Sequence, residues 1–289
     1  MKFKAIHFFL CFVFIFLPSK SFAIEGSKDL YEDKDDPLSF MVEVLPWDQV
    51  NNIMPKYTIF TIIDVETGLS FKVQRRAGSQ HADVQPLTYK DTKIMKKIYN
   101  GKWSWNRRAI LVLVGDQLLA ASMHGMPHGA GALNNGFPGH FCVHFWESTT
   151  HKKEKMDPSH QLMILKAAGK LENYLNGINP YKMIEIFALA VNNHDKNILG
   201  ETLAQNKYKQ KLTTKMIKDI SYFSIIEMPL VPMEDLHGQF VMEVPVKVEF
   251  LDKNKGKSKK FIHFVVRRDS LIDRWYIEGQ TVLKEVNIG

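Results

Sequence analysis

Residues 109–123 read AILVLVGDQLLAASM, and this stretch decides the fold class. Residues 109–114 are all apolar and predict a buried strand, and Gly115-Asp116-Gln117 predicts a turn. Residues 118–123 are then expected to return as the partner strand. The N-terminal half should therefore be mostly β.

The neighbouring segments support this interpretation. A second hairpin is expected from strands at 57–64 and 69–73 around the turn at 66–68. Residues 125–139 contain five glycines and two prolines and predict a loop, and residues 141–145 predict a strand. We expect helices at 88–99 and 158–175, with Thr88 as the cap of the first.

After residue 176 the pattern changes. Gly177 to Pro180 predicts a linker, and a helix with apolar residues at three- and four-residue spacing follows. A short helix is expected at 199–204, with strands at 217–228, 240–251, 261–268 and 275–283. Helices followed by long alternating strands resemble the cone-shaped fold of nuclear transport factor two-like domains. We therefore predict an α+β protein with domains at 38–176 and 177–289, the second serving as an accessory domain that self-associates.

The N-terminus has the features of a secretory signal peptide. Lys2 and Lys4 precede an apolar run at 5–17, and Ser21-Phe22-Ala23 fits the small-x-small cleavage rule. We expect cleavage after residue 23, a charged leader at 24–37 and a location in the cell envelope. The formal charge then falls from +7 to +4 as three lysines leave, which is too weak a balance to indicate nucleic-acid binding. No apolar run reaches the ~20 residues of a membrane span, so no membrane partner is expected after cleavage.

The mature chain has one cysteine, Cys142, inside a cluster of histidines. Six histidines fall within 37 residues: His124, His128, His140, His144, His151 and His160. Alternate residues of a strand share a face, so His140, Cys142 and His144 should project together while Phe141, Val143 and Phe145 enter the core. Histidine is the base that activates a thiol at neutral pH. Cys142 is therefore a candidate nucleophile, and the glycine-rich loop can bring His128 over it.

Two motifs resemble those of the L,D-transpeptidase family. Met126-Pro-His-Gly129 and Gly139-His-Phe-Cys-Val-His144 are similar to its paired histidine and cysteine motifs, and residues 64–68, 81–88 and 103–108 resemble an exported Gram-positive branch. Gly139, Phe141 and His144 depart from the usual residues of the family. The resemblance implies a mostly β catalytic domain that acts on peptidoglycan stem peptides. In it, Cys142 would be the nucleophile, His128 the base, Gly129 the carbonyl that orients the base, and His140 with Cys142 the frame of the oxyanion.

Substrate contacts are expected from His144, Trp103, Trp105, Arg107 and Arg108, because arginine pairs with carboxylates. No organic cofactor is implied, since no glycine-rich phosphate loop follows a strand.

Two alternative functions remain. The first is a zinc-dependent peptidase or amidase, with His81, Asp83, His140 and His144 as metal ligands. The second is a non-catalytic peptidoglycan-binding protein, in which aromatic rings stack on sugars. Its candidate residues are Trp47, Trp103, Trp105 and Trp146.

Overall fold

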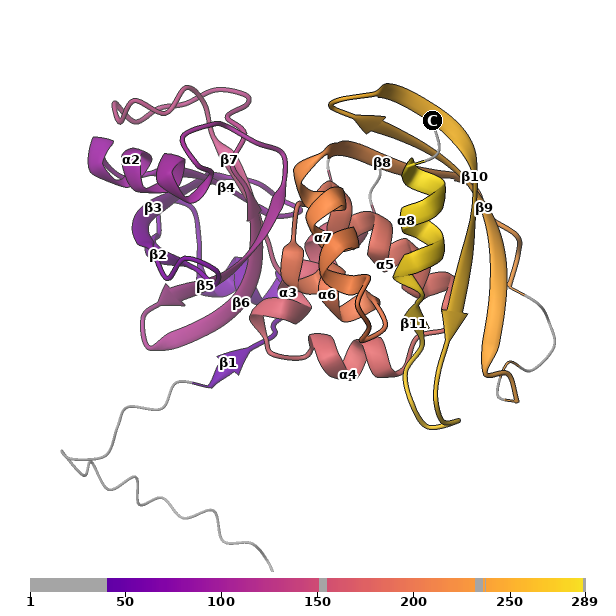
Figure 1. Ribbon diagram of the computed structural model, residues 1–289. Helices are drawn as coiled ribbons and strands as arrows, with labels where there is room; N and C mark the ends of the chain where they lie inside the picture. Colours follow the sequence, from indigo (N-terminus) through magenta and orange to yellow (C-terminus); the bar gives the residue numbers. More distant parts are fainter. Residues whose placement is uncertain (1–40, 151–154, 232–235, 237, 288–289) are drawn as a thin grey trace, which may run out of the picture. The chain divides into compact units, whose positions relative to one another are not determined.

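The computed structural model describes residues 41–150, 155–231, 236 and 238–287. The expected signal peptide and leader lie outside the described residues, as does His151. The described residues belong to one compact unit. Their fold is mixed α and β, as expected, and contains a closed barrel and a separate curled sheet (Figure 1).

Six antiparallel strands close into the barrel. Their order is β6-β5-β2-β3-β4-β7, and β7 pairs with β6 to complete the ring. The short β1 (Val42–Glu43) runs parallel to the first part of β6. The barrel strands are β2 (Ile59–Asp64), β3 (Ser70–Ala77), β4 (Ala82–Pro86), β5 (Arg107–Val114), β6 (Gln117–His124) and β7 (Phe141–His144).

Alternation along the strands fills the barrel. Phe60 and Ile62 of β2 and Phe71 and Val73 of β3 are buried in one core, while the residues between them are more exposed. Helix α2 (Tyr89–Ile98) adds Met95 and Ile98 to that core, and α1 (Trp47–Ile53) adds Trp47 and Val50. The predicted cap of α2 is confirmed, since Thr88 and Asp91 form a reciprocal capping box.

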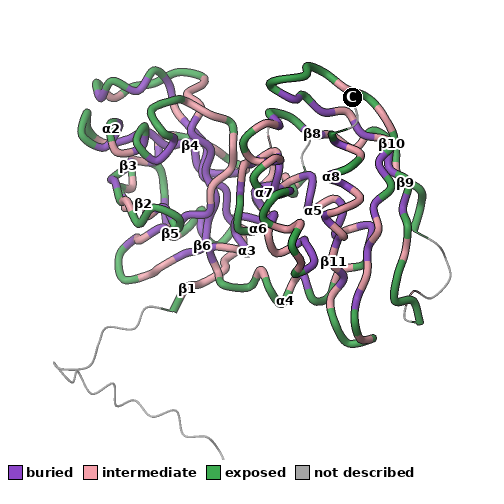
Figure 2. Tube along the Cα trace, in the orientation of Figure 1, coloured by how far each residue is buried: buried purple, intermediate pink, exposed green. Residues whose placement is uncertain are grey.

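The C-terminal half is a curled four-stranded sheet with helices. The sheet has the order β11-β10-β9-β8 and buries one face against the helices (Figure 2). Its strands are β8 (Ile220–Glu227), β9 (Val241–Asp252), β10 (Gly256–Arg267) and β11 (Tyr276–Ile277). The helices of this half are α4 (Leu171–Asn176), α5 (Pro180–Asn192), α6 (Lys196–Thr202), α7 (Lys209–Lys218) and α8 (Gly279–Asn287).

Several expected elements are wrong. Residues 275–283 are a two-residue strand followed by helix α8, because Val282, Leu283 and Val286 have helical spacing and are buried. The expected helix 158–175 is two helices, α3 (Pro158–Ala167) and α4, because Gly169 takes a φ of +67° that ends the first. Residues 217–218 still belong to α7, and β4 was not predicted as a strand.

Helix α3 joins the two halves. Its residues Leu162 and Met163 are buried in one core with Ala109 of β5, Ala120 of β6 and the apolar face of the curled sheet. Because this core is shared by both halves, the domain boundary expected at residue 177 stays a prediction. Within the part of the chain that the structure describes, no helix has the length and apolar character needed to cross a membrane.

Candidate functional site

The pairing of β4 with β7 builds the floor of the site. Asp83 lies directly opposite Cys142 in the register of the two strands, and the thiol Sγ is 3.6 Å from Asp83 Oδ1. Both residues are buried, at 6% and 4% exposure. The strand alternation predicted for β7 is confirmed, because Phe141, Val143 and Phe145 enter the barrel core while Cys142 lines a cavity.

The glycine-rich loop folds back over this floor. The amides and carbonyls of His128 and His140 exchange two hydrogen bonds of 2.9 Å, which bring the two imidazoles side by side. Gly139 permits this fold at a φ of +120°, where a Cβ would lie 2.5 Å from the carbonyl oxygen of His128. The buried Gln85 of β4 fixes the loop by donating to the Gly139 carbonyl and accepting from the amides of Ala132 and Leu133.

Three imidazoles are held in a common orientation. The Nδ1 atoms of His81, His128 and His140 lie 2.8, 3.2 and 3.0 Å from the carbonyl oxygens of Thr149, Met126 and Ala130. Because a carbonyl only accepts, each Nδ1 carries the proton in the neutral ring and Nε2 keeps its lone pair. The Nε2 of His128 lies 3.4 Å from Cys142 Sγ. Those of His81 and His140 lie 3.3 and 3.7 Å from Asp83 Oδ1.

The remaining histidines form one wall. His144 stacks between His81 and His160, with ring centroids 4.4 and 3.8 Å apart and planes within 18°. His160 Nδ1 lies 2.9 Å from Ser122 Oγ, and the ring of His124 contacts those of Trp105 and His128. Burial, reinforced by the neighbouring histidines, holds the pKa of His124 and of His160 well below the usual value. These two rings are therefore neutral at pH 7.

These side chains surround a cavity of about 520 Å³. Its volume lies within the range of small-molecule sites. Arg107 and the half-exposed Trp105 stand beside its histidines, and Arg107 is held by an ion pair of 2.7 Å with Asp157. The lining residues are His81, Trp105, Arg107, His124, His128, Cys142, His144, Thr150, Lys155, Met156, Asp157, Pro158 and His160.

The resting thiol is protonated. Burial raises the pKa of Cys142 well above that of a free cysteine, and the charge and hydrogen bond of Asp83 raise it further. The charge of Arg107 acts in the opposite direction but is the smaller influence. Chemistry at Cys142 therefore needs a base in contact with the thiol or a cation that replaces its proton.

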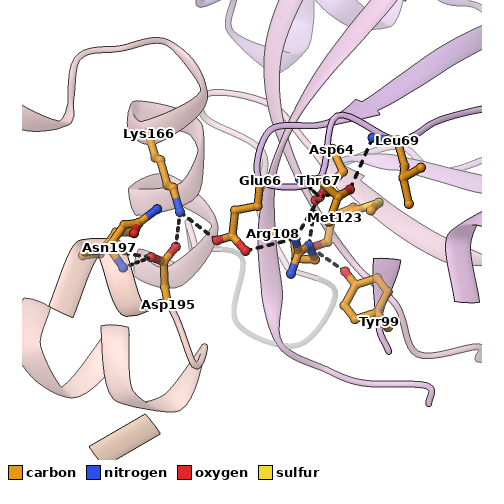
Figure 3. Close-up of polar contacts among 11 residues, drawn as sticks. Asp64, Glu66, Thr67, Leu69, Tyr99, Arg108, Met123, Lys166, Asp195 and Asn197 are labelled. Carbon is orange, nitrogen blue, oxygen red and sulfur yellow. Dashed lines mark hydrogen bonds and ion pairs between the residues drawn. The ribbon is translucent and has the colours of Figure 1, made fainter. Parts of the chain in front are cut away.

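The structure separates the two predicted arginines. Arg107 lines the cavity, whereas Arg108 forms a bidentate pair with the buried Asp64, at 2.6 and 2.8 Å, and contacts Glu66 at 3.1 Å. Figure 3 shows Arg108 between these two carboxylates, with Glu66 reaching on to Lys166 of α3. Arg108 thus belongs to a structural network with Asp64 and Glu66 and does not line the cavity.

The predicted loop residues have different contacts from those expected. The carbonyl beside His128 Nδ1 belongs to Met126, while Gly129 lies against the ring of His140, where a Cβ would come within 2.3 Å of Cε1. The amide of His140 donates to the carbonyl of His128. It is therefore engaged within the loop and is not directed at an oxyanion.

The four tryptophans are dispersed. Trp47 stacks on Phe145 in the barrel core, Trp103 packs edge-on against Phe137, and Trp146 packs against the C-terminal core. Trp105 alone among the four lines the cavity. A continuous aromatic platform for sugar rings is therefore not formed by these side chains.

Sequence reasoning gave no role to several residues of the site. His124 and His160 were only members of a cluster, although their neighbours Trp105 and Ser122 fix them in the cavity wall. Asp157 caps α3 and forms an ion pair with Arg107. An Asp-Pro pair before an apolar helix is the sequence signal that could have identified Asp157 as a helix cap. The role of Asp83 opposite the thiol required β4, a strand that was missed.

Among the residues that the structure describes, two groups of side chains could hold a metal ion. The ligand atoms of His81, Cys142 and His144 lie within 4.8 Å of one another, as do those of His124, His128 and Cys142.

A scan against protein-family models finds no family that matches this chain, and a search of curated proteins also finds no match.

Proposed function

We propose that the protein is an exported cysteine acyltransferase of the L,D-transpeptidase type that acts on peptidoglycan stem peptides. The observation that carries the proposal is the distance of 3.4 Å between Cys142 Sγ and His128 Nε2 at the wall of the cavity. A nucleophile within reach of a base that a third group orients is the arrangement needed for covalent catalysis. The Met126 carbonyl is that third group.

The chemistry has two balanced steps. Cys142 Sγ attacks the carbonyl carbon before a terminal D-amino acid, and the thiol proton passes to His128 Nε2. The C–N bond breaks, the proton returns to the leaving amine, and a thioester remains on the enzyme. An amine of a second stem, or water, then attacks the thioester and releases Cys142 with its proton.

The raised pKa of the thiol fits proton transfer during attack. A free thiolate next to Asp83 is unfavourable, so no stable thiolate–imidazolium pair is expected at rest. His128 instead accepts the proton as the S–C bond forms. Arg107 and Lys155 are cationic side chains of the cavity, and we assign the carboxylate of the stem peptide to Arg107, whose guanidinium can make two parallel hydrogen bonds to it; Trp105 lines the same cavity.

The test is the intact mass of the purified protein after incubation with a muropeptide or a carbapenem in the presence of a chelator. We expect an adduct on the wild type, none on Cys142→Ala, and a much slower reaction for His128→Gln. His263→Ala is the matched control, because His263 is an exposed histidine of β10 that pairs with Glu285. A folded wild-type protein that forms no adduct with either reagent contradicts the proposal.

A further inference from the structure

The centre of the site combines one thiol, one buried carboxylate and several oriented imidazoles. Three contacts follow one another through it: His81 Nε2 to Asp83 Oδ1 at 3.3 Å, Asp83 Oδ1 to Cys142 Sγ at 3.6 Å, and Cys142 Sγ to His128 Nε2 at 3.4 Å. In the neutral forms of the rings, both Nε2 atoms present lone pairs to this centre. The thiol proton is then the one hydrogen that these four side chains bring to it.

The three consecutive separations match those between neighbouring ligand atoms of a tetrahedral zinc ion, and the ligand atoms of His81 and of His128 each lie within 4.8 Å of that of Cys142. Zn²⁺ binds nitrogen and oxygen at about 2.0–2.1 Å and sulfur at about 2.3 Å, so neighbouring ligand atoms lie roughly 3.3–3.6 Å apart. All three contacts fall close to that range. Thiolate and imidazole ligands favour Zn²⁺ over the oxygen-binding cations Mg²⁺ and Ca²⁺.

The second contacts of the histidines are also those of metal ligands. A metal-bound imidazole usually donates its other N–H to a carbonyl or carboxylate, which fixes its tautomer and orientation. His81 and His128 do this toward the carbonyls of Thr149 and Met126. His124 has the opposite arrangement, since its Nδ1 accepts from the amide of Met126.

The geometry also selects among the histidines. An imidazole nitrogen binds a metal ion in the plane of its ring, and the rings of His81 and His144 are stacked 4.4 Å apart with planes 18° apart. Because the two rings are stacked with nearly parallel planes, an ion in the plane of one ring lies outside the plane of the other, so we do not assign both rings to one ion. The Nε2 of His140 lies 3.7 Å from Asp83, just beyond the range above.

We propose that His81, Asp83, Cys142 and His128 form a binding site for a thiophilic divalent cation, Zn²⁺, and that this ion and the acyl substrate compete for Cys142. The competition rests on the proposed function, whereas binding of the ion does not. Binding replaces the thiol proton, which is released to solvent, with a Zn–S bond. The ion takes both the sulfur and the lone pair of the base, so the loaded protein is inactive in acyl transfer.

Cobalt provides the direct test, because Co²⁺ bound to a thiolate gives a near-ultraviolet charge-transfer band. Titration of the reduced protein with Co²⁺ should produce this band with one equivalent, and Zn²⁺ should abolish it. Cys142→Ser should remove the band. Asp83→Asn and His81→Ala should weaken binding by roughly tenfold or more, and the surface control His263→Ala should bind as the wild type does.

Circular dichroism identifies any variant that fails to fold, and the near-isosteric Asp83→Asn keeps the test valid if His81→Ala unfolds. Absence of the band above one equivalent of Co²⁺, or wild-type affinity in folded Asp83→Asn, overturns the proposal.

A second experiment separates the metal site from the acyl-transfer function. The carbapenem adduct on Cys142 is measured with chelator and with one equivalent of Zn²⁺. If the adduct forms with chelator but not with Zn²⁺, the ion and the substrate compete. Equal adduct formation under the two conditions contradicts the competition. A cobalt–thiolate band without any adduct leaves the metal site standing and rejects acyl transfer.

Discussion

Arg108 and Asp64 form a buried bidentate ion pair, with nitrogen–oxygen distances of 2.6 and 2.8 Å, while the adjacent Arg107 faces the cavity. Neighbouring residues of one strand therefore have different tasks. Glu66 extends the pair to Lys166, which also contacts Asp195, so the network ties β2 and β5 of the barrel to α3 and α6 (Figure 3).

Arg108→Ala should lower the free energy of unfolding by about 3–5 kcal/mol, because it leaves the buried Asp64 carboxylate without its partner. The measurement is denaturant unfolding at pH 7. Arg108→Lys should recover only part of the loss, since lysine cannot make two parallel hydrogen bonds. A loss below about 1 kcal/mol in Arg108→Ala, the range of exposed pairs, would falsify this structural role.

Arg107→Ala should weaken substrate binding and leave the stability almost unchanged, in contrast to Arg108→Ala. Its pair with Asp157 is partly exposed, so stability should change by no more than about 1 kcal/mol. If Arg107 binds the stem-peptide carboxylate, KM for a muropeptide should rise by about 10- to 100-fold, the loss of a charge-assisted hydrogen bond. The same variant should be acylated normally by a small uncharged thioester or amide probe, and an unchanged KM would exclude the contact.

Gly139→Ala should destabilise the protein far more than Gly68→Ala. Both glycines have positive φ, but a Cβ on Gly139 meets the His128 carbonyl at 2.5 Å, whereas a Cβ on Gly68 meets nothing within 4 Å. The control should cost about 1–2 kcal/mol for the left-handed backbone alone. Thermal unfolding compares the two, and iodoacetamide labelling of Cys142 reports displacement of the loop. Equal effects of the two substitutions would show that the close contact does not matter.

Asp252 should make stability depend on acid pH. Burial acts to raise its pKa, but hydrogen bonds from Lys215 and from the amide of Asn254 outweigh burial and lower the pKa below the usual value. The unfolded carboxyl titrates near 3.9. The stabilisation is therefore complete above that pH and is lost as pH falls through the lower folded pKa.

Lys215 gives the alkaline counterpart of this effect. Burial acts to lower its pKa, yet the hydrogen bond and charge of Asp252 raise it above the usual value. The stabilisation is present below about 10.4 and is lost as pH rises through the folded pKa. Unfolding curves from pH 2 to 11 should show that the wild type loses stability at both acid and alkaline pH. Both losses should be smaller in Asp252→Asn. Parallel pH profiles of the two proteins would count against this account.

The sequence predicted elements where a single regular pattern dominates. The hairpin at 109–123 and the alternation around Cys142 are confirmed, because each strand has one buried face or a continuous apolar run. Strand β4 was missed because it is short and ends in Pro86, although Ala82 to Gln85 alternate between apolar and polar residues. Its charged member, Asp83, appeared to belong to a metal motif or a turn when no partner strand was known.

The part of the site that was predicted also depends on regular local patterns in the sequence. Spacing within one strand placed Cys142 beside its histidines, and the glycine-rich loop indicated that His128 would approach the thiol. Contacts that join distant segments left no local pattern. The pairs Arg107–Asp157 and His160–Ser122 are separated by 50 and 38 residues, and only the closed barrel and α3 bring them together.

Strand β7 is the last barrel strand in the chain, and it pairs with β4 on one side and β6 on the other. Until residue 144 is in place, the ring remains open and Asp83 has no thiol opposite it. Cys142 therefore lies opposite Asp83 only when β7, the last strand of the barrel, pairs with β4. The site therefore depends on the last strand of the barrel: without residues 141–144, the ring is not closed and no thiol lies opposite Asp83.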